Sequence, residues 1–185
     1  MLNDVYSQTK AAMDKAVEAL EHDLAKLRTG RASTGLVEEL LVEYYGTPTA
    51  LQSLALISVP EPQLITIRPY DPGAMKAIEK AIMQSDLGLN PNNDGKMIRL
   101  QIPRLTEERR RDLSKGAAKR VEEARVSVRN ARRQQLDVLK NAEKNKEISE
   151  DEMYNGRDRI QKLTDDYISL IDEIGQAKEQ EIMEV

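Results

Sequence analysis

Proline is confined to the middle of this chain. All seven prolines lie between Pro48 and Pro103 of a 185-residue sequence. Proline removes a backbone donor and its ring clashes with the preceding helical turn, so a helix seldom continues through it. The flanking segments 1–30 and 104–185 are therefore free to form long helices, whereas the middle must be rich in turns.

Apolar residues in the flanks recur at steps of three and four, which line up along one face of a helix. Three such stripes occur: Met13, Val17, Leu20, Leu24 and Leu27; then Leu113, Ala117, Val121, Ala124, Val128, Ala131 and Leu139, interrupted at Gln135; then Met153, Ile160, Leu163, Tyr167, Leu170 and Ile174. No amphipathic helix can bury its own stripe. The pattern therefore predicts a three-helix bundle built from residues 1–30 and 105–185.

The starts of the two later helices are marked by capping residues. Ser149 is followed three residues later by Glu152, the signature of a capping box. Thr106 precedes two glutamates, whose charge suits the positive end of a helix dipole. From Thr106 to about Lys146 the pattern predicts a helix of about 40 residues, or about 60 Å.

The middle segment has the pattern of a small α+β domain. Strand-like stretches lie at 40–45, 54–59, 63–68 and 97–102, a helical pattern at 74–85, and a predicted loop at 90–95. We therefore expect an α+β protein of two domains, in which a β/α/β domain of residues 31–104 is inserted between the first and second long helices.

An inserted domain requires the chain to cross between domains twice. The crossings fall near residues 28–33 and 102–106, where Gly30 permits unusual backbone angles and Pro103 stops a strand. Two adjacent crossings predict a two-stranded hinge, since such domain interfaces usually permit motion. The expected hinge residues are Thr29, Gly30, Arg31, Pro103, Arg104 and Leu105.

Basic charge is gathered in one segment of an acidic protein. The chain has net charge −4, yet residues 106–146 hold 13 basic and 7 acidic side chains, and RVSVRNARRQ at 125–134 holds four arginines with no acid among them. Projected at about 100° per residue, these arginines share one face beside the apolar stripe. They either pair with the acidic last helix or bind a polyanion through bidentate phosphate contacts. RNA, DNA and acidic lipid remain open as that polyanion.

Several functional classes lack support. The chain has no cysteine, a single histidine at His22, no glycine-rich phosphate loop, and no apolar run of about 18 residues. Acidic pairs such as Asp165–Asp166 are typical of a solvated helix face. We therefore expect a cytoplasmic protein that is not an enzyme, with no metal or cofactor and no membrane segment.

Longer matching stretches carry a family resemblance. LRTGRAS (27–33), VEYYGTPTALQSLA (42–55), EKAIMQSDLGLNPNNDG (79–95), LTEERRRDLSK (105–115), ARVSVRNARRQ (124–134) and KEISEDE (146–152) follow one another in order. Together they resemble bacterial ribosome recycling factor. Thr34 and Arg104 depart from the family pattern, which often has proline after RAS and an apolar residue or proline before LTEER.

The resemblance implies an L-shaped monomer that binds the large ribosomal subunit and, with elongation factor G and its GTP hydrolysis, splits the ribosome into subunits. It implies contact with ribosomal RNA through Arg129 and Arg132, supported by Arg28, Arg110, Arg125 and Arg133, and contact of the inserted domain with elongation factor G. The alternative is a helical adaptor or chaperone that binds proteins through its apolar seams.

Overall fold

The computed structural model describes residues 1–184 and divides them into two compact units. One unit comprises Met1–Thr29 and Glu107–Glu184, and the other comprises Gly30–Thr106. Long helices form the first unit and a small sheet domain the second, so the predicted α+β class is confirmed. Val185, which the expected bundle range includes, lies outside the described residues.

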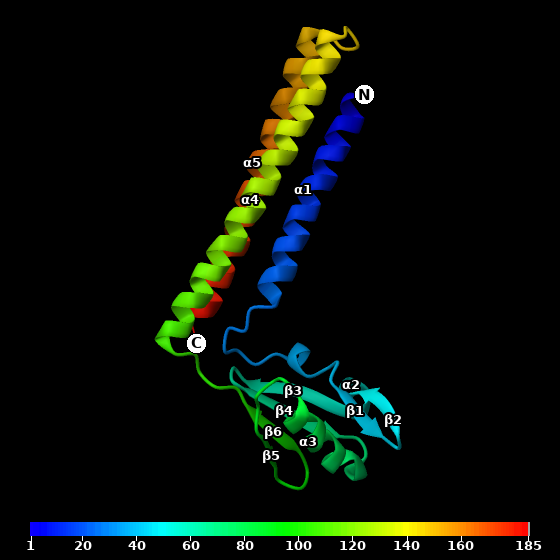
Figure 1. Cartoon of the computed structure of the whole chain (residues 1–185), viewed down its shortest axis with the longest axis vertical. Coiled ribbons are helices and arrows are strands. Elements are labelled where there is room, and N and C mark those ends of the chain that lie inside the picture. Colours follow the sequence, from blue (N-terminus) through cyan, green and yellow to red (C-terminus); the bar gives the residue numbers. More distant parts are fainter. Residues whose placement is uncertain (185) are drawn as a thin grey trace. The chain divides into compact units, whose positions relative to one another are not determined.

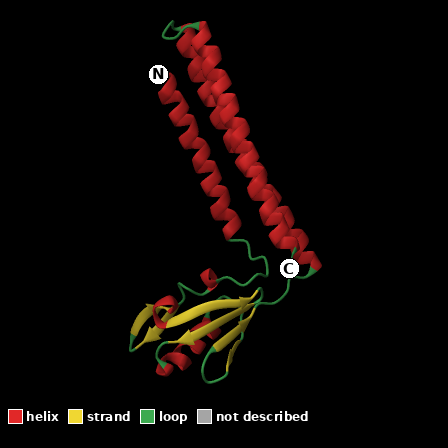
Figure 2. Cartoon of the chain, turned by 180° about the vertical axis from the view of Figure 1, so that it is seen from behind, coloured by secondary structure: helices red, strands yellow, loops and turns green. Residues whose placement is uncertain are grey.

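Three helices form the bundle: α1 (Leu2–Ala25), α4 (Glu107–Lys144) and α5 (Glu150–Met183). They lie side by side, and α1 begins short of the connection between α4 and α5 (Figure 1). The view from behind shows the same arrangement (Figure 2). All seven apolar residues of the predicted α4 stripe are buried, and Ala142 extends the stripe by one position. Packing of these stripes against one another stabilises helices of this length.

The predicted stripe of α5 is wrong at one position. Leu170 is 40% exposed, whereas the adjacent Ile171 is fully buried. Val5 and Thr9 extend the buried row of α1 toward its start, and Ile182 extends that of α5 toward its end. The helix repeat is not a whole number of residues, so a buried row shifts by one position along a long helix.

The ends of α4 and α5 are held by backbone and capping bonds. The capping box is confirmed, because Ser149 Oγ accepts from the Glu152 N–H and Glu152 accepts from the Ser149 N–H. At the end of α4, Lys146 has φ of 60°, and the Glu147 N–H donates to the Ala142 carbonyl at 2.9 Å. A left-handed residue with this bond closes a helix, a position that usually takes glycine.

The second unit contains two antiparallel sheets. A hairpin pairs β1 (Leu41–Tyr44) with β2 (Thr47–Ala50), and a second sheet has the order β3 (Ala55–Glu61), β4 (Leu64–Pro69), β6 (Ile98–Gln101), β5 (Pro91–Asn93). The helical elements are η1 (Thr34–Leu36), α2 (Leu51–Leu54), η2 (Pro72–Ala74) and α3 (Met75–Gln84). Strands β1, β3, β4 and β6 and helix α3 agree with the sequence prediction.

Strands β2 and β5 correct that prediction, which included no strand at 47–50 and a loop at 90–95. Both contain a proline, Pro48 and Pro91, and both lie at the edge of their sheets. Proline is tolerated at an edge because its missing donor would face solvent. The hairpin turn uses positive φ at Tyr45 and Gly46, 49° and 77°, as tight hairpins require.

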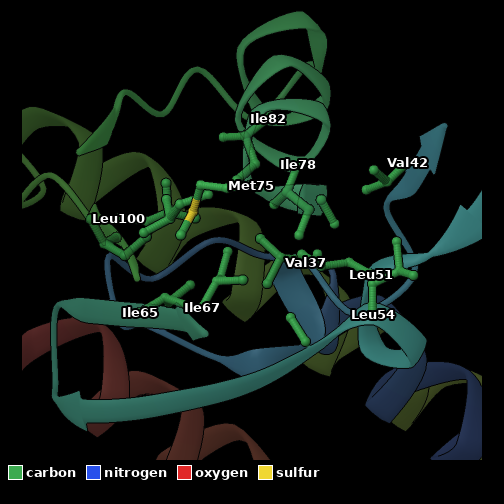
Figure 3. Packing of buried hydrophobic residues seen from close by; sticks show 14 residues of the cluster. Val37, Val42, Leu51, Leu54, Ile65, Ile67, Met75, Ile78, Ile82 and Leu100 are labelled. Carbon is green, nitrogen blue, oxygen red and sulfur yellow. The ribbon is translucent and has the colours of Figure 1, made fainter. Parts of the chain in front are cut away.

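The core of the second unit lies between α3 and the four-stranded sheet. Met75, Ile78 and Ile82 extend from α3 toward the sheet residues Ile65, Ile67 and Leu100 (Figure 3). Five of these six side chains are at most 1% exposed, and Met75 is 7% exposed. Side chains alternate between the two faces of a strand, so the polar residues between these apolar ones in β4 and β6 point to the face of the sheet away from α3.

Both crossing segments are tied to the turn between β3 and β4. The Ala32 N–H donates to the Pro62 carbonyl at 2.7 Å, and the Ile102 N–H donates to the Gln63 carbonyl at 2.8 Å. Arg104 adds a bond from its Nε to Gln63 Oε1 at 3.3 Å. The two segments that leave this unit are thereby held next to each other at one turn.

Candidate nucleic-acid interface

The candidate interface lies on the second half of α4. We call Arg125, Arg129, Arg132 and Arg133 the arginine face. Helices α4 and α5 run antiparallel, so that Leu139 lies against Gly156. Arg125 and Arg132 both reach across to α5. Arg125 and Arg132 therefore lie next to α5, whereas Arg129 and Arg133 are exposed on α4.

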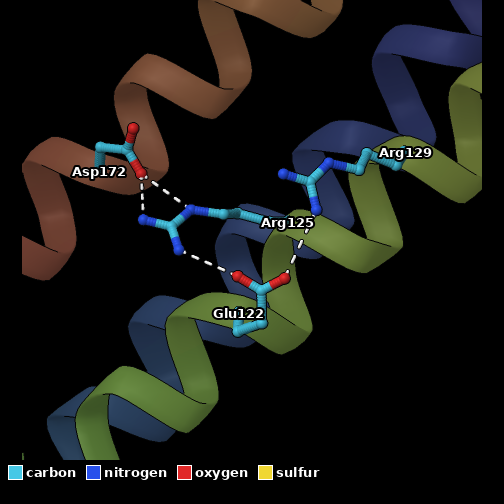
Figure 4. A network of polar contacts seen from close by, with 4 residues as sticks. All are labelled: Glu122, Arg125, Arg129 and Asp172. Atoms are coloured by element: carbon cyan, nitrogen blue, oxygen red, sulfur yellow. Dashed lines mark hydrogen bonds and ion pairs between the residues drawn. The ribbon is translucent and has the colours of Figure 1, made fainter.

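Arg125 is the most constrained of the four arginines. Its Nε and Nη2 donate to Asp172 Oδ1 of α5 at 2.9 and 2.6 Å, and its Nη1 donates to Glu122 Oε2 at 3.0 Å (Figure 4). Its side chain is 30% exposed. Asp172, followed by Glu122, raises the pKa of Arg125 above its usual value. All three guanidinium nitrogens are occupied, so Arg125 works as a brace between the helices.

Arg129 shares a carboxylate with Arg125. Its Nη1 lies 3.4 Å from Glu122 Oε1, and its side chain is 47% exposed. No other bond joins Arg129 to a residue of the described part of the chain. Its Nε and Nη2 are therefore available to an incoming anion.

Arg132 and Arg133 face different surroundings. Arg132 Nε donates to Gln161 Oε1 at 2.8 Å, and Gln161 Nε2 in turn donates to Asp165 at 2.9 Å. This chain of bonds orients Arg132 and leaves its two terminal nitrogens open. Arg133 is exposed and makes no hydrogen bond or ion pair within residues 1–184. A planar fork with free donors suits a phosphate group.

The absence of acids from residues 125–133 does not leave all the arginines unpaired. Arg125 and Arg129 are paired by carboxylates outside that stretch, namely Glu122 and Asp172. The contact of Glu122 with Arg125 could have been read from their spacing of three residues. The contact with Asp172 depends on how α5 packs against α4, for which the sequence has no local signal.

Arg28 and Arg110 lie away from the arginine face. Arg28 is exposed and follows α1, and Arg110 lies in the first turns of α4. Fifteen residues separate Arg110 from Arg125, or about 22 Å along a helix. Arg110 borders an open groove with Arg111, Lys115 and Glu179, and its buried Nε has no hydrogen-bond partner among the described residues.

The expected hinge residues lie at the boundary between the units. Thr29 is buried and ends one unit, and Gly30, with φ of 76°, begins the other. Pro103 and Arg104 are exposed, and Leu105 is half-buried, just before α4. Arg31 is exposed. The hinge itself stays a prediction.

The remaining sequence candidates form no site. His22 is exposed on α1. No group of three or more acidic or histidine side chains within residues 1–184 could hold a metal ion. Across the same residues, every helix falls short of the length and apolar character needed to cross a membrane.

Comparison with known proteins connects this geometry to a family. The sequence profile of the family described as "Ribosome recycling factor" matches residues 20–183. Proteins named ribosome-recycling factor from Chloroflexus aggregans and Geobacillus kaustophilus are 60% and 56% identical to this chain over 185 residues, with full coverage of both chains.

Solved structures agree with the sequence comparison. A structure entitled as the solution structure of the ribosome recycling factor is 48% identical, with a TM-score of 0.76, and the match covers 100% of this chain and 98% of the other. A second structure is entitled as models for the T. thermophilus ribosome recycling factor and the E. coli elongation factor G bound to the E. coli post-termination complex. It is 46% identical, with a TM-score of 0.64 and 99% coverage of both chains. The chain therefore belongs to the ribosome recycling factor family.

Proposed function

We propose that this protein binds the ribosome after termination and, together with elongation factor G and the GTP hydrolysis of that factor, separates the ribosomal subunits. Full-length similarity to named ribosome-recycling factors supports this function. The similar structure entitled as the factor and elongation factor G on a post-termination complex supports both partners. The protein itself supplies binding and leverage, and the GTPase supplies the chemistry.

The arginine face is the proposed contact with phosphates of large-subunit ribosomal RNA. The observation that carries this assignment is the set of open guanidinium nitrogens on Arg129, Arg132 and Arg133, all on one flank of a 38-residue helix. The arginines share one continuous helix, so their backbone positions keep a fixed spacing that an RNA backbone can match. Arg28 and Arg110 extend the contact toward the start of α4.

The inserted domain is the proposed lever on which elongation factor G acts. Both of its crossing segments are hydrogen-bonded to the β3–β4 turn, at Pro62 and Gln63, which supports a defined attachment. Thr29, Gly30 and Arg31 in one crossing, with Pro103, Arg104 and Leu105 in the other, are the proposed hinge. Force applied to the small unit would reach the bundle through these six residues.

The adaptor alternative has less support. An adaptor would offer an apolar seam to a partner, whereas Val17, Val128 and Ile171 from the three helices are all buried in the bundle. A partner helix could reach these seams only by opening the bundle.

The proposed RNA contact is tested by binding to isolated large subunits. Arg129→Ala and Arg132→Ala should weaken binding, and each should lower the slope of log affinity against log salt by about 0.7 to 0.9, as expected for one lost phosphate contact. Arg120→Ala is the matched control, since it lies on the same helix but pairs with Asp23 of α1. Its effect should be clearly smaller.

A subunit-splitting assay with elongation factor G completes the test. Variants that bind weakly should split ribosomes slowly at low factor concentration. If Arg129→Ala and Arg132→Ala bind like the unaltered protein, the arginine face is a solvated surface and the proposed contact is wrong.

A further inference from the structure

Glu122 borders the arginine face, one turn before its first member Arg125 on α4. Both of its carboxylate oxygens are engaged, Oε2 by Arg125 at 3.0 Å and Oε1 by Arg129 at 3.4 Å (Figure 4). Its side chain is 54% exposed. An exposed acid next to a surface that binds a polyanion repels that polyanion and weakens its binding.

Helix geometry explains how one carboxylate reaches both arginines. Long side chains on a helix lean toward its N-terminus. Arg125 and Arg129, three and seven residues after Glu122, therefore both lean back toward it. With Asp172 on the other side of Arg125, two guanidinium groups are matched by two carboxylates. Half of the arginine face is thus neutralised in the free protein.

The two ion pairs of Glu122 differ in how easily they open. Arg125 donates two hydrogen bonds to Asp172 Oδ1, and a movement away from Glu122 would break this contact with α5. Arg129 has a single long contact, and no other hydrogen bond or ion pair within the described chain holds its guanidinium. A phosphate can therefore displace the Glu122 carboxylate from the Arg129 guanidinium, while Arg125 remains bound to Asp172.

We propose that Glu122 is an internal competitor for phosphate, which occupies Arg129 in the free protein and limits how tightly and how long the factor holds RNA. This inference rests on the proposed function and deepens it by naming the residue that tunes release. A carboxylate and a phosphate use the same guanidinium donors, so only one of them can hold Nη1 of Arg129. A phosphate on Nε and Nη2 would lie beside the negative charge of Glu122 and be repelled by it. A factor that must leave the ribosome after each cycle gains faster dissociation from such a competitor.

The alternative is that Glu122 contributes to stability. Exposed ion pairs contribute little, because solvent screens them and ordering the side chains costs entropy. Glu122 is more than half exposed, and both of its ion pairs are with residues of α4. Its removal should therefore leave the thermal unfolding of the bundle nearly unchanged, which separates the two roles.

The test compares Glu122→Gln with Glu123→Gln in association and dissociation rates on large subunits. Both substitutions remove one negative charge from the same turn of α4. Glu123 is exposed and has no hydrogen bond or ion pair within the described chain. Glu122→Gln should bind about two- to fivefold tighter, the range expected for one exposed ion pair. Most of the gain should appear as slower dissociation, and Glu123→Gln should gain clearly less.

A double mutant gives a second readout. In an Arg129→Ala background the advantage of Glu122→Gln over Glu123→Gln should largely disappear, because the competed donor is gone. Equal affinities for the two glutamine variants would overturn the proposal. Weaker binding by Glu122→Gln would also overturn it, since Glu122 would then be orienting Arg129 for the phosphate.

The same measurements separate this proposal from the proposed function. If Arg129→Ala and Arg132→Ala fail to weaken binding, the RNA contact itself is wrong. If they weaken binding while Glu122→Gln brings no tightening beyond its control, only the competitor role of Glu122 fails.

Discussion

Thr29 donates a hydrogen bond from Oγ1 to Oε1 of Glu181 at 2.9 Å and so ties the chain that leaves α1 to the last turns of α5. Thr29 is only 4% exposed, and Lys178 Nζ lies 3.3 Å from the other oxygen of Glu181. Thr29, the last residue of the bundle before the first crossing, is therefore held by Glu181 near the end of α5.

Glu181→Ala should destabilise the bundle by about 1 kcal/mol or more, because a buried hydroxyl loses its acceptor. Glu173→Ala is the control, since Glu173 is exposed on α5 and makes no hydrogen bond or ion pair within residues 1–184. Urea unfolding followed by circular dichroism at the helix signal measures the difference. Equal midpoints for the two variants would contradict the importance of the Thr29 bond.

Gly175→Ala should destabilise the bundle, although alanine is the better helix former. A Cβ at Gly175 would lie 2.9 Å from Cγ2 of Val121, a branched side chain with one preferred rotamer in a helix. Overpacking of this kind costs about 1–3 kcal/mol, against a propensity gain of about 1 kcal/mol.

Gly116→Ala is the matched control for Gly175→Ala. A Cβ at Gly116 meets nothing within 4 Å, so this variant should gain most of the propensity term. The midpoint of thermal unfolding should therefore rise in Gly116→Ala and fall in Gly175→Ala. A gain in stability for both would mean that α4 and α5 separate at little cost.

Lys146→Gly should stabilise the protein by about 0.5–1 kcal/mol, because φ of 60° is costly for lysine and free for glycine. Lys144→Gly, in the last turn of α4, should instead destabilise it by up to about 1 kcal/mol. Chemical unfolding checks both signs. A loss of stability in Lys146→Gly would indicate that the lysine side chain contributes more than its backbone conformation costs.

Tyr44 should titrate late in the alkaline range. Its hydroxyl donates to Asp71 Oδ2 at 2.8 Å, and this bond raises the pKa of Tyr44 to about 12. A raised pKa means that the stabilising contribution is complete below pH 10 and is lost as the pH rises from about 10 through about 12. Tyrosinate absorbance during a pH titration should show this late group.

Tyr44→Phe should remove one late group from that titration, whereas Tyr45→Phe should leave it in place. Tyr167, whose pKa is raised by burial and by its hydrogen bond to Asp14, should still titrate late in both variants. Tyr45 is adjacent and 86% exposed, and its ring packs edge-on against Tyr44 without bonding to Asp71. An unchanged number of late tyrosines in Tyr44→Phe would contradict the assignment to Tyr44.

Local patterns in the sequence predicted most of the architecture. Proline placement separated the long helices from the sheet domain, and apolar spacing identified the buried row of α4, because both effects act within one or two helical turns. Strands β2 and β5 were missed because a local pattern does not show whether a segment lies at the edge of a sheet. Their prolines forbid a central strand, and only the completed sheet shows that these segments lie at edges.

The arginine face shows the same division between what neighbours along the chain determine and what packing decides. The sequence by itself placed four arginines on one flank of α4, since angular position follows from the helix repeat. Tertiary structure alone decided that Arg125 is braced by Asp172, that Gln161 orients Arg132, and that Arg133 stays open. Those contacts depend on the register between two antiparallel helices, which long-range packing of Val121, Leu139 and the glycines of α5 sets.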